Sequence, residues 1–205
     1  MIAIIDYDMG NLRSVQKGLE RVGCRAQVTR DLQQIASARG IVLPGVGAFN
    51  ACMENLRRFG LVELIRDVVR QKKPFLGICL GFQLLFKESE EFGSQMGLDL
   101  FPGRVLGFHP EGNLKVPHMG WNRIKKKKET PFLDGISDRN FVYFVHSYYA
   151  VPEEASIVAT TTDYGTSFVS SIATDHLFAC QFHPEKSQTV GLRILANFAL
   201  FVEKG

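Results

Sequence analysis

The stretch FLGICLG at residues 75–81 decides how this sequence is interpreted. Its first four residues are typical of a strand buried on both faces, and the helical-looking residues Leu80–Phe86 follow at once. Cys79 therefore lies on a tight turn, with a glycine two positions before it and another two positions after it. Those glycines keep flanking Cβ atoms from colliding with the strand and the helix. The pattern is the cysteine form of a nucleophile elbow and predicts that Cys79 is a nucleophile.

The alternative for Cys79 is a buried structural thiol, which is the usual state of a lone cysteine. The flanking glycines and the adjacent helix start, which favours a thiolate, indicate a reactive thiol instead. The other cysteines, Cys24, Cys52 and Cys180, lack this context and are predicted to be core thiols. No two cysteines form a CxxC pair, so neither a zinc site nor a disulfide framework is expected.

A thiolate nucleophile needs a base and a group that orients the base. The stretch CQFHPE at residues 180–185 offers both, because its predicted strand ends at His183 and Pro184 fixes the direction in which the chain leaves. Residues two apart in an extended chain share a side, so Glu185 can hold the imidazole of His183. We predict that Cys79, His183 and Glu185 form a catalytic triad.

Strands and helices alternate in the first half of the chain. Met1–Asp6 and Ile41–Leu43 are predicted strands, whereas apolar residues recur at helical spacing over residues 12–22 and 61–69. From about residue 95 the pattern changes, because residues 101–116 are loop-like and the strands that follow have no long helices between them. These later strands are Phe141–Val145, Ile157–Thr161, Phe168–Ile172 and Leu177–Phe182.

These patterns predict an α/β fold. Strand–helix alternation implies an open, mostly parallel sheet flanked by helices, and the later strands imply an antiparallel extension of that sheet. A final helix is predicted around residues 195–202. Because no repeat, linker or low-complexity segment divides the chain, residues 1–205 are expected to form one domain.

Composition excludes several classes of function. The 205 residues are 45% hydrophobic and 22% charged, with 24 basic and 21 acidic residues and a net charge of +3, as in ordinary globular proteins. The run Lys125–Lys128 is a solvated loop or, less often, a partner contact, and no aromatic-interleaved basic stripe indicates nucleic-acid binding. The longest apolar run, Pro74–Phe86, is too short to span a membrane. With no export signal, a cytoplasmic protein with reduced thiols is expected.

Several motifs carry a resemblance to a known family. GICLGFQLL at residues 77–85, with the distant FHPE at 182–185, resembles the class I (triad) glutamine amidotransferases, which hydrolyse glutamine to glutamate and ammonia. Longer motifs, spread from one end of the chain to the other, resemble the glutaminase subunits of imidazole glycerol phosphate synthase. They are IDYDMGNLRSV at 5–15, LPGVGAF at 43–49, VPHMGWN at 116–122, YFVHSYY at 143–149 and QFHPEKSQ at 181–188. One position departs, because Asp8 stands where the family pattern has glycine.

The resemblance implies a flavodoxin-like fold, the same triad, and neither a cofactor nor a metal. Gln83 lies one helical turn beyond Cys79, so its amide can face the same pocket. Trp121, the only tryptophan, suits either a partner contact or a core anchor. The glutamine-binding positions that the resemblance implies are Gly47, Gln83, Ser147 and Tyr148, and the implied partner contacts are Gly10, Asn11, Trp121 and Lys186.

Two backbone N–H groups are expected to stabilise the tetrahedral oxygen formed at Cys79. The N–H of Leu80, at the helix start, is a natural oxyanion donor. Val46 lies between Gly45 and Gly47, which allow the intervening peptide to rotate. The N–H of Val46 can then point away at rest and toward the oxyanion when a partner is loaded. The alternative is that these glycines merely allow a tight turn.

The resemblance also implies what the ammonia is for. In the family it passes to a separate (β/α)₈-barrel synthase subunit, which forms imidazole glycerol phosphate in histidine biosynthesis. That implies glutamine as substrate and a heterodimer with such a barrel. A paralogous glutaminase that supplies ammonia for amidation of bacterial surface sugars is the alternative. A non-catalytic scaffold is disfavoured because the triad residues are present, and a cysteine peptidase would not need Gln83 or the HSYY stretch.

Overall fold

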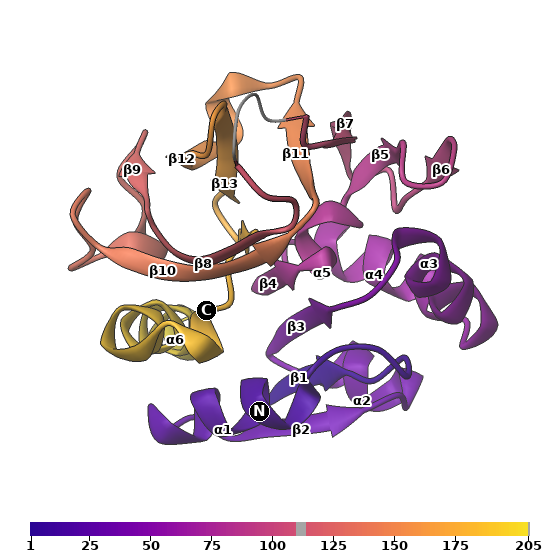
Figure 1. Ribbon diagram of the computed structural model, residues 1–205. Helices are drawn as coiled ribbons and strands as arrows, with labels where there is room; N and C mark the ends of the chain where they lie inside the picture. Colours follow the sequence, from indigo (N-terminus) through magenta and orange to yellow (C-terminus); the bar gives the residue numbers. More distant parts are fainter. Residues whose placement is uncertain (110–113, 205) are drawn as a thin grey trace.

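An eight-stranded sheet in the order β2-β1-β3-β4-β14-β13-β12-β9 forms the centre of the structure, a computed structural model that describes residues 1–109 and 114–204 (Figure 1). All residues of β1, β3, β4 and β14 are buried, as expected for parallel strands covered on both faces. The parallel part of the sheet that the sequence predicts is therefore confirmed. Its strands are β1 Ile2–Ile5, β2 Ala26–Thr29, β3 Gly40–Gly45, β4 Phe75–Cys79 and β14 Leu177–Cys180.

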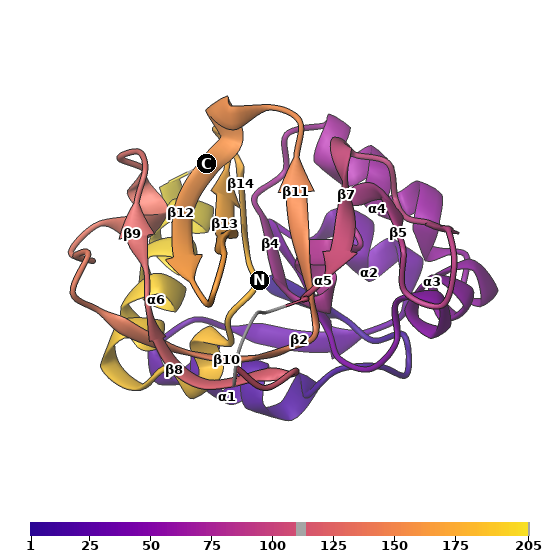
Figure 2. The same cartoon turned by 45° about the horizontal axis from the view of Figure 1, so that its top comes forward.

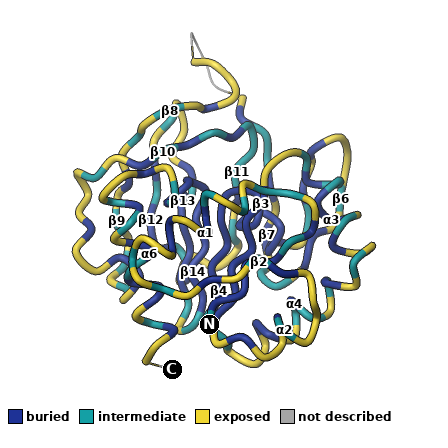
Figure 3. The backbone as a smooth tube through the Cα atoms, turned by 90° about the horizontal axis from the view of Figure 1, so that it is seen from below, coloured by how far each residue is buried: buried dark blue, intermediate teal, exposed yellow. Residues whose placement is uncertain are grey.

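Helices cover both faces of the parallel strands. Along β1, Ile2 and Ile4 join the apolar cluster of α1 and α6, whereas Ala3 and Ile5 join the cluster of α2, α3, α4 and α5. Figure 3 shows the buried strands in dark blue beneath a largely exposed outer layer. The helices are α1 Leu12–Arg21, α2 Leu32–Ser37, α3 Phe49–Arg58, α4 Leu61–Arg70, α5 Leu80–Gln83 and α6 Gln188–Lys204.

Antiparallel strands extend the sheet beyond β14, as predicted. β13 Ser167–Ala173, β12 Val158–Asp163 and β9 Lys125–Lys126 follow in that order. β11 lies beside β13, so a four-stranded sheet adjoins the main one (Figure 2). The four-stranded sheet consists of β5 Phe86–Ser89, β6 Gln95–Met96, β7 Phe101–Gly107 and β11 Tyr148–Pro152, and a separate pair consists of β8 His118–Arg123 and β10 Phe141–His146.

Three predictions about residues 80–128 were wrong. The helix after Cys79 does not continue to Phe86, because Phe86 begins β5 and pairs with Phe101 of β7. Residues 101–107 of the predicted loop 101–116 form β7, and residues 110–113 of that range lie outside the described residues. The first two lysines of the predicted loop Lys125–Lys128 form β9. Within the described residues, no helix is long and apolar enough to cross a membrane.

Candidate active site

The turn between β4 and α5 has the geometry of a nucleophile elbow. Cys79 has φ +55° and ψ −111°, a backbone conformation that residues with a side chain rarely adopt. A Cβ on Gly81 would collide with the carbonyl oxygen of Leu43, and a Cβ on Gly77 would lie 3.0 Å from the Cβ of Ala179. Both glycines are therefore required by the close approach of β4 and α5 to their neighbours, which confirms the predicted elbow.

His183 and Glu185 follow the end of β14, the neighbour of β4 in the sheet. The strand ends at Cys180 and not at His183 as predicted, and Glu185 lies in a 3₁₀ turn, Pro184–Lys186, and not in the expected extended chain. His183 Nδ1 lies 2.8 Å from Glu185 Oε1, and the two side chains are 2% and 1% exposed. Because Nδ1 is engaged by the carboxylate, Nε2 is the nitrogen left for Cys79. His183 Nε2 is buried and makes no hydrogen bond within residues 1–109 and 114–204, so it is free to exchange a proton at Cys79.

The charge state of His183 depends on its two neighbours. Burial alone lowers the pKa of His183, but the Cys79 thiolate and, after it, the Glu185 carboxylate outweigh burial and raise that pKa to about 10. The environment therefore favours a His183 imidazolium, which is the proton donor that a cysteine nucleophile needs for its leaving group.

A cavity of about 310 Å³ opens in front of Cys79. It brings together the predicted nucleophile, base, oxyanion donors and glutamine-binding positions, whereas Glu185 lies behind His183. The cavity is in the size range of sites for small molecules. Its lining residues are Val46, Gly47, Cys79, Leu80, Gln83, Glu91, Pro117, Val145, His146, Ser147, Tyr148 and His183.

Gln83 reaches the cavity wall as predicted, and its amide also holds that wall together. Gln83 Nε2 donates to the carbonyl oxygen of Tyr148 at 2.8 Å and to Gln181 Oε1 at 2.9 Å. The side chain is only 4% exposed, so these bonds are shielded from water. Gln83 thus ties α5 to β11 and to the strand end that carries His183.

The loop after β3 forms the opposite side of the cavity. Val46 is 39% exposed, and Gly47 has φ +98°, which favours glycine. The Tyr7 hydroxyl donates to the carbonyl oxygen of Pro44 at 2.6 Å, and the Cys52 thiol lies 3.7 Å from the carbonyl oxygen of Val46. Burial raises the pKa of Cys52 to about 12, so this thiol keeps its proton.

Sequence reasoning missed two polar residues of the site. Gln181 is fully buried, and its Nε2 lies 3.8 Å from Cys79 Sγ. Glu91 is 9% exposed and lines the cavity, and its Oε2 accepts the N–H of Phe49 at 2.8 Å. The position of Gln181 two residues before His183 was an available signal, whereas Glu91 lies in an acidic stretch with no periodic pattern.

The predicted partner contacts lie in two places. Trp121 is 46% exposed on β8, which excludes the core-anchor alternative. Its ring centroid lies 6.0 Å from that of Tyr143, and Lys186 Nζ lies 5.8 Å from the same Tyr143 ring. Gly10 and Asn11 follow β1 instead, where a Cβ on Gly10 would lie 3.5 Å from the Cβ of Pro44 and the Asn11 side chain caps α1.

Asp8, which stands where the resemblance leads us to expect glycine, has a backbone conformation that glycine favours. Its φ is +63°, in the left-handed region that glycine favours and aspartate tolerates. Its carboxylate lies 2.6 Å from Arg30 and 2.8 Å from Arg58, in partly exposed ion pairs. The aspartate at position 8 is therefore accommodated by two nearby side chains, Arg30 between β2 and α2 and Arg58 in α3.

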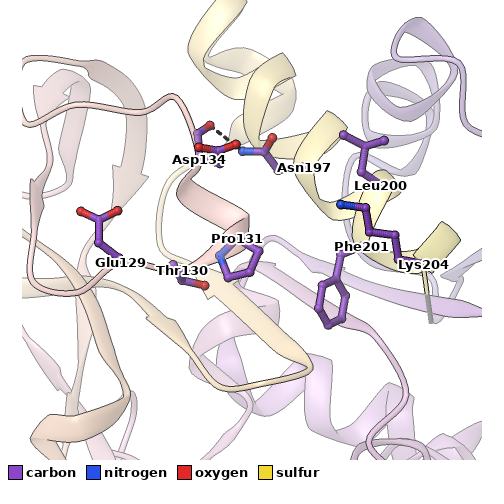
Figure 4. Close-up of a pocket in the computed structure, with 8 residues that line it drawn as sticks. All are labelled: Glu129, Thr130, Pro131, Asp134, Asn197, Leu200, Phe201 and Lys204. Atoms are coloured by element: carbon purple, nitrogen blue, oxygen red, sulfur yellow. Dashed lines mark hydrogen bonds between the residues drawn. The ribbon is translucent and has the colours of Figure 1, made fainter.

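A larger cavity, of about 710 Å³, lies between α6 and residues 129–134 (Figure 4). The Asn197 amide in it already donates to the carbonyl oxygens of Phe132 and Asp134. Its lining includes neither a cysteine nor a histidine, so the cavity at Cys79 is the better candidate for chemistry. Among the described residues, no group of three or more His, Cys, Asp or Glu side chains is placed to hold a metal ion.

Comparison with known proteins identifies the class. The family described as glutamine amidotransferase class-I matches residues 3–202, so the chain belongs to that family. Within it, the chain groups with the imidazole glycerol phosphate synthase subunits HisH. The protein of that name from Syntrophotalea carbinolica is 58% identical over 97% of this chain and 98% of its own length. The one from Aquifex aeolicus is 52% identical over 98% and 97%, and these names favour the synthase over the sugar-amidation alternative.

Solved structures agree on the fold. A crystal structure of a glutamine amidotransferase has a TM-score of 0.76 at 17% identity and covers 99% of this chain and 100% of that one. PurLQS from Thermotoga maritima has a TM-score of 0.73 at 17% identity and covers 99% and 97%. The α/β fold with an antiparallel extension is therefore shared with class-I glutamine amidotransferases.

Proposed function

We propose that the cavity at Cys79 hydrolyses glutamine to glutamate and ammonia, and that the ammonia passes to a (β/α)₈-barrel synthase partner for imidazole glycerol phosphate formation in histidine biosynthesis. The observation that carries this proposal is the left-handed elbow of Cys79 facing the buried His183–Glu185 pair. A chain 58% identical to a named synthase subunit supports the assignment of the pathway.

The reaction proceeds in two halves. The Cys79 thiolate attacks the side-chain amide carbon of glutamine, and the tetrahedral intermediate collapses when the His183 imidazolium gives its proton to the departing ammonia. A γ-glutamyl thioester remains on Cys79. His183, now neutral, takes a proton from water, whose oxygen attacks the thioester, and glutamate leaves as the thiolate returns. The N–H groups of Leu80 and Val46 stabilise the oxyanion in both halves.

Glu91 and backbone groups of three other cavity residues bind the amino-acid end of glutamine. Glu91 places a carboxylate in a cavity that also holds Cys79, and suits the α-ammonium group. Backbone groups of Gly47, Ser147 and Tyr148 are candidates for the α-carboxylate and α-amino groups. Gln83 holds the wall on which Tyr148 lies.

The protonation of ammonia in water explains why a docked partner is needed. Free ammonia is protonated in neutral water and loses its nucleophilic lone pair, so the acceptor must receive it directly. The proposed docking surface includes exposed Trp121 and Lys186 beside the half-buried Tyr143 and, at a second place after β1, Gly10 and Asn11. The four cysteines are free, which supports work in a reducing compartment such as the cytoplasm.

Partner dependence tests the proposal. We expect the isolated chain to hydrolyse glutamine slowly, and a HisH-associated barrel subunit with its nucleotide ligand to raise the rate by orders of magnitude. Glutamate release is measured for the chain alone, with the barrel, and with the barrel and ligand, and co-purification checks the complex. A free chain as fast as the loaded complex contradicts the coupling, and the absence of glutamate in every sample contradicts the glutaminase assignment.

A further inference from the structure

A chain of buried imidazoles runs beside the glutamine cavity and takes no part in the reaction above. His118 on β8 and His146 at the end of β10 are 3% and 6% exposed. His118 Nδ1 lies 2.9 Å from His146 Nε2, and His146 Nδ1 lies 2.8 Å from the carbonyl oxygen of Tyr148. At the other end, Asn122 Nδ2 lies 3.2 Å from His118 Nε2.

Only one arrangement of protons satisfies all these contacts. A carbonyl oxygen only accepts, so His146 Nδ1 carries a proton and donates to Tyr148. Burial outweighs the hydrogen bond to the Tyr148 carbonyl, which raises the pKa of His146, and together with smaller lowering contributions from His118 and His183 it brings that pKa to about 3. Burial lowers the pKa of His118 to about 4. Both rings are therefore neutral, with one N–H each. His146 Nε2 must then accept from His118 Nδ1, and His118 Nε2 must accept from Asn122.

The orientation of Asn122 is fixed independently. Asn122 Nδ2 also donates to the carbonyl oxygen of Asp163 at 2.8 Å, and Asn122 Oδ1 accepts the N–H of Arg123 at 2.8 Å. The amide nitrogen therefore faces His118, as the chain requires. Every hydrogen bond from Asn122 to Tyr148 runs in the same direction.

The inner end of the chain reaches the nucleophile. The Tyr148 carbonyl that accepts from His146 also accepts from Gln83 Nε2. Gln83 in turn donates to Gln181, whose Nε2 lies 3.8 Å from Cys79 Sγ. The position of one carbonyl oxygen therefore depends on both the imidazole chain and the cavity wall.

The outer end lies on a strand with one buried and one exposed face. On β8, His118 and Asn122 point inward, whereas Met119 and Trp121 are 62% and 46% exposed on the other side. We propose that His118 and His146 are positioning residues, which fix the Tyr148 carbonyl and, through it, Gln83, so that the glutamine cavity keeps a set position relative to β8. The effect of this positioning on the KM for glutamine rests on the proposed glutaminase reaction, whereas the proton arrangement does not.

A pair of variants at His118 tests the kinetic consequence in the loaded complex. His118→Phe preserves the ring that stacks on Tyr164 at 4.0 Å but removes the donor to His146. His118→Asn is the matched control, because its amide nitrogen can occupy the place of Nδ1. We expect His118→Phe to raise the KM for glutamine about tenfold with kcat changed by less than about twofold, because the Tyr148 carbonyl and the Gln83 side chain lose the contact that holds them in the position that binds glutamine. A tenfold rise corresponds to about 1.4 kcal/mol of binding free energy.

The His118→Asn control shows whether a change in KM comes from loss of the donor to His146. We expect His118→Asn to stay close to the wild type in both constants. A fall in kcat without a rise in KM for His118→Phe overturns the positioning role, and so does a KM for His118→Asn that equals that of His118→Phe. Loss of glutamate release by the wild-type complex would instead contradict the proposed function.

The proton arrangement is tested without any activity measurement, and without a destabilising variant. Nitrogen NMR of the wild-type chain, with imidazole ¹⁵N labels at neutral pH, distinguishes the two tautomers and the cation. His118→Asn and His146→Asn serve only to assign the signals. We expect both rings to carry their proton on Nδ1 and none on Nε2. A proton on Nε2 of either ring, or on both nitrogens of one ring, overturns the proposal.

Discussion

Two walls of the glutamine cavity are held by different parts of the fold. The triad wall, formed by Cys79, His183 and Glu185, follows adjacent parallel strands, and its three side chains are almost fully buried. The oxyanion wall, formed by Val46 and Gly47, follows the end of β3, and Val46 is 39% exposed. The groups that we propose to make and break bonds are therefore fixed in the core, while one of the two proposed oxyanion donors lies on an exposed loop.

The difference indicates where regulation of the rate can act. Moving the triad wall would require rearrangement of the buried core around β4 and β14, whereas one peptide between Gly45 and Gly47 can rotate at small steric cost. A partner that docks beside this loop can change the oxyanion donor without disturbing the nucleophile. Substitutions in the two walls should therefore affect turnover differently.

The largest effect is expected on the triad wall. Cys79→Ala should lower glutamine hydrolysis by about 10⁶-fold, because loss of a nucleophile leaves only binding and oxyanion stabilisation. The barrel partner should still form product when an ammonium salt replaces glutamine. Cys24→Ala, at a half-buried thiol away from the cavity, should leave hydrolysis unchanged. A Cys79→Ala complex that fails with ammonia as well would show that Cys79 is structural.

On the oxyanion wall, Val46→Pro should remove one donor while the nucleophile remains. We expect a loss of about 10²–10³-fold in partner-stimulated turnover, the usual effect of a missing oxyanion donor. Cys79 in this variant should still react with a glutamine-like alkylating agent. Val46→Ala retains the N–H and serves as the control. Full stimulation of a folded Val46→Pro protein would eliminate the peptide-rotation hypothesis and leave the tight-turn alternative.

A third measurement tests the electrostatics of the triad wall. The Cys79 thiolate is the larger of the two influences that raise the pKa of His183, so its removal disfavours the imidazolium. We expect Cys79→Ala to lower the pKa of His183 by about 1–3 units, the usual influence of a close opposite charge. NMR titration of His183 measures this shift. Glu185→Gln should lower the same pKa by less, and an unchanged value in Cys79→Ala would contradict the ion pair.

The triad wall could be predicted from sequence because its signals are local. The glycines around Cys79 mark a turn that only they permit, and Glu185 lies two residues from His183 with Pro184 between them. Each pattern needs only a few consecutive residues. The alternation of strand and helix, which gave the parallel sheet, is local in the same sense.

What could not be predicted depends on packing between distant segments. Glu91 belongs to the cavity because it meets the N–H of Phe49, 42 positions away. The helix after Cys79 ends early because Phe86 pairs with Phe101, and the Phe82 and Phe86 rings pack edge to face at 5.4 Å. Apolar periodicity cannot distinguish such a strand from a helical turn, since both bury the same side chains.

The smallest effect is expected on stability, at Tyr7, whose hydroxyl contacts Pro44 just before the oxyanion wall. Burial raises the pKa of Tyr7 well above its usual range, so its hydroxyl keeps the proton that it donates to Pro44. Tyr7→Phe leaves that carbonyl without its partner and should lower the free energy of unfolding by about 1 kcal/mol. For a chain of this length that corresponds to a fall of about 2–4 °C in Tm.

Tyr149→Phe is the matched control for Tyr7→Phe, because the Tyr149 hydroxyl makes no side-chain hydrogen bond among the described residues. Urea unfolding of both variants measures the difference. If Tyr7→Phe is no less stable than Tyr149→Phe, the Tyr7–Pro44 hydrogen bond does not help to hold this loop. A selective loss of stability shows instead that the bond stabilises the fold at Pro44, just before Gly45 and the peptide that carries the Val46 N–H.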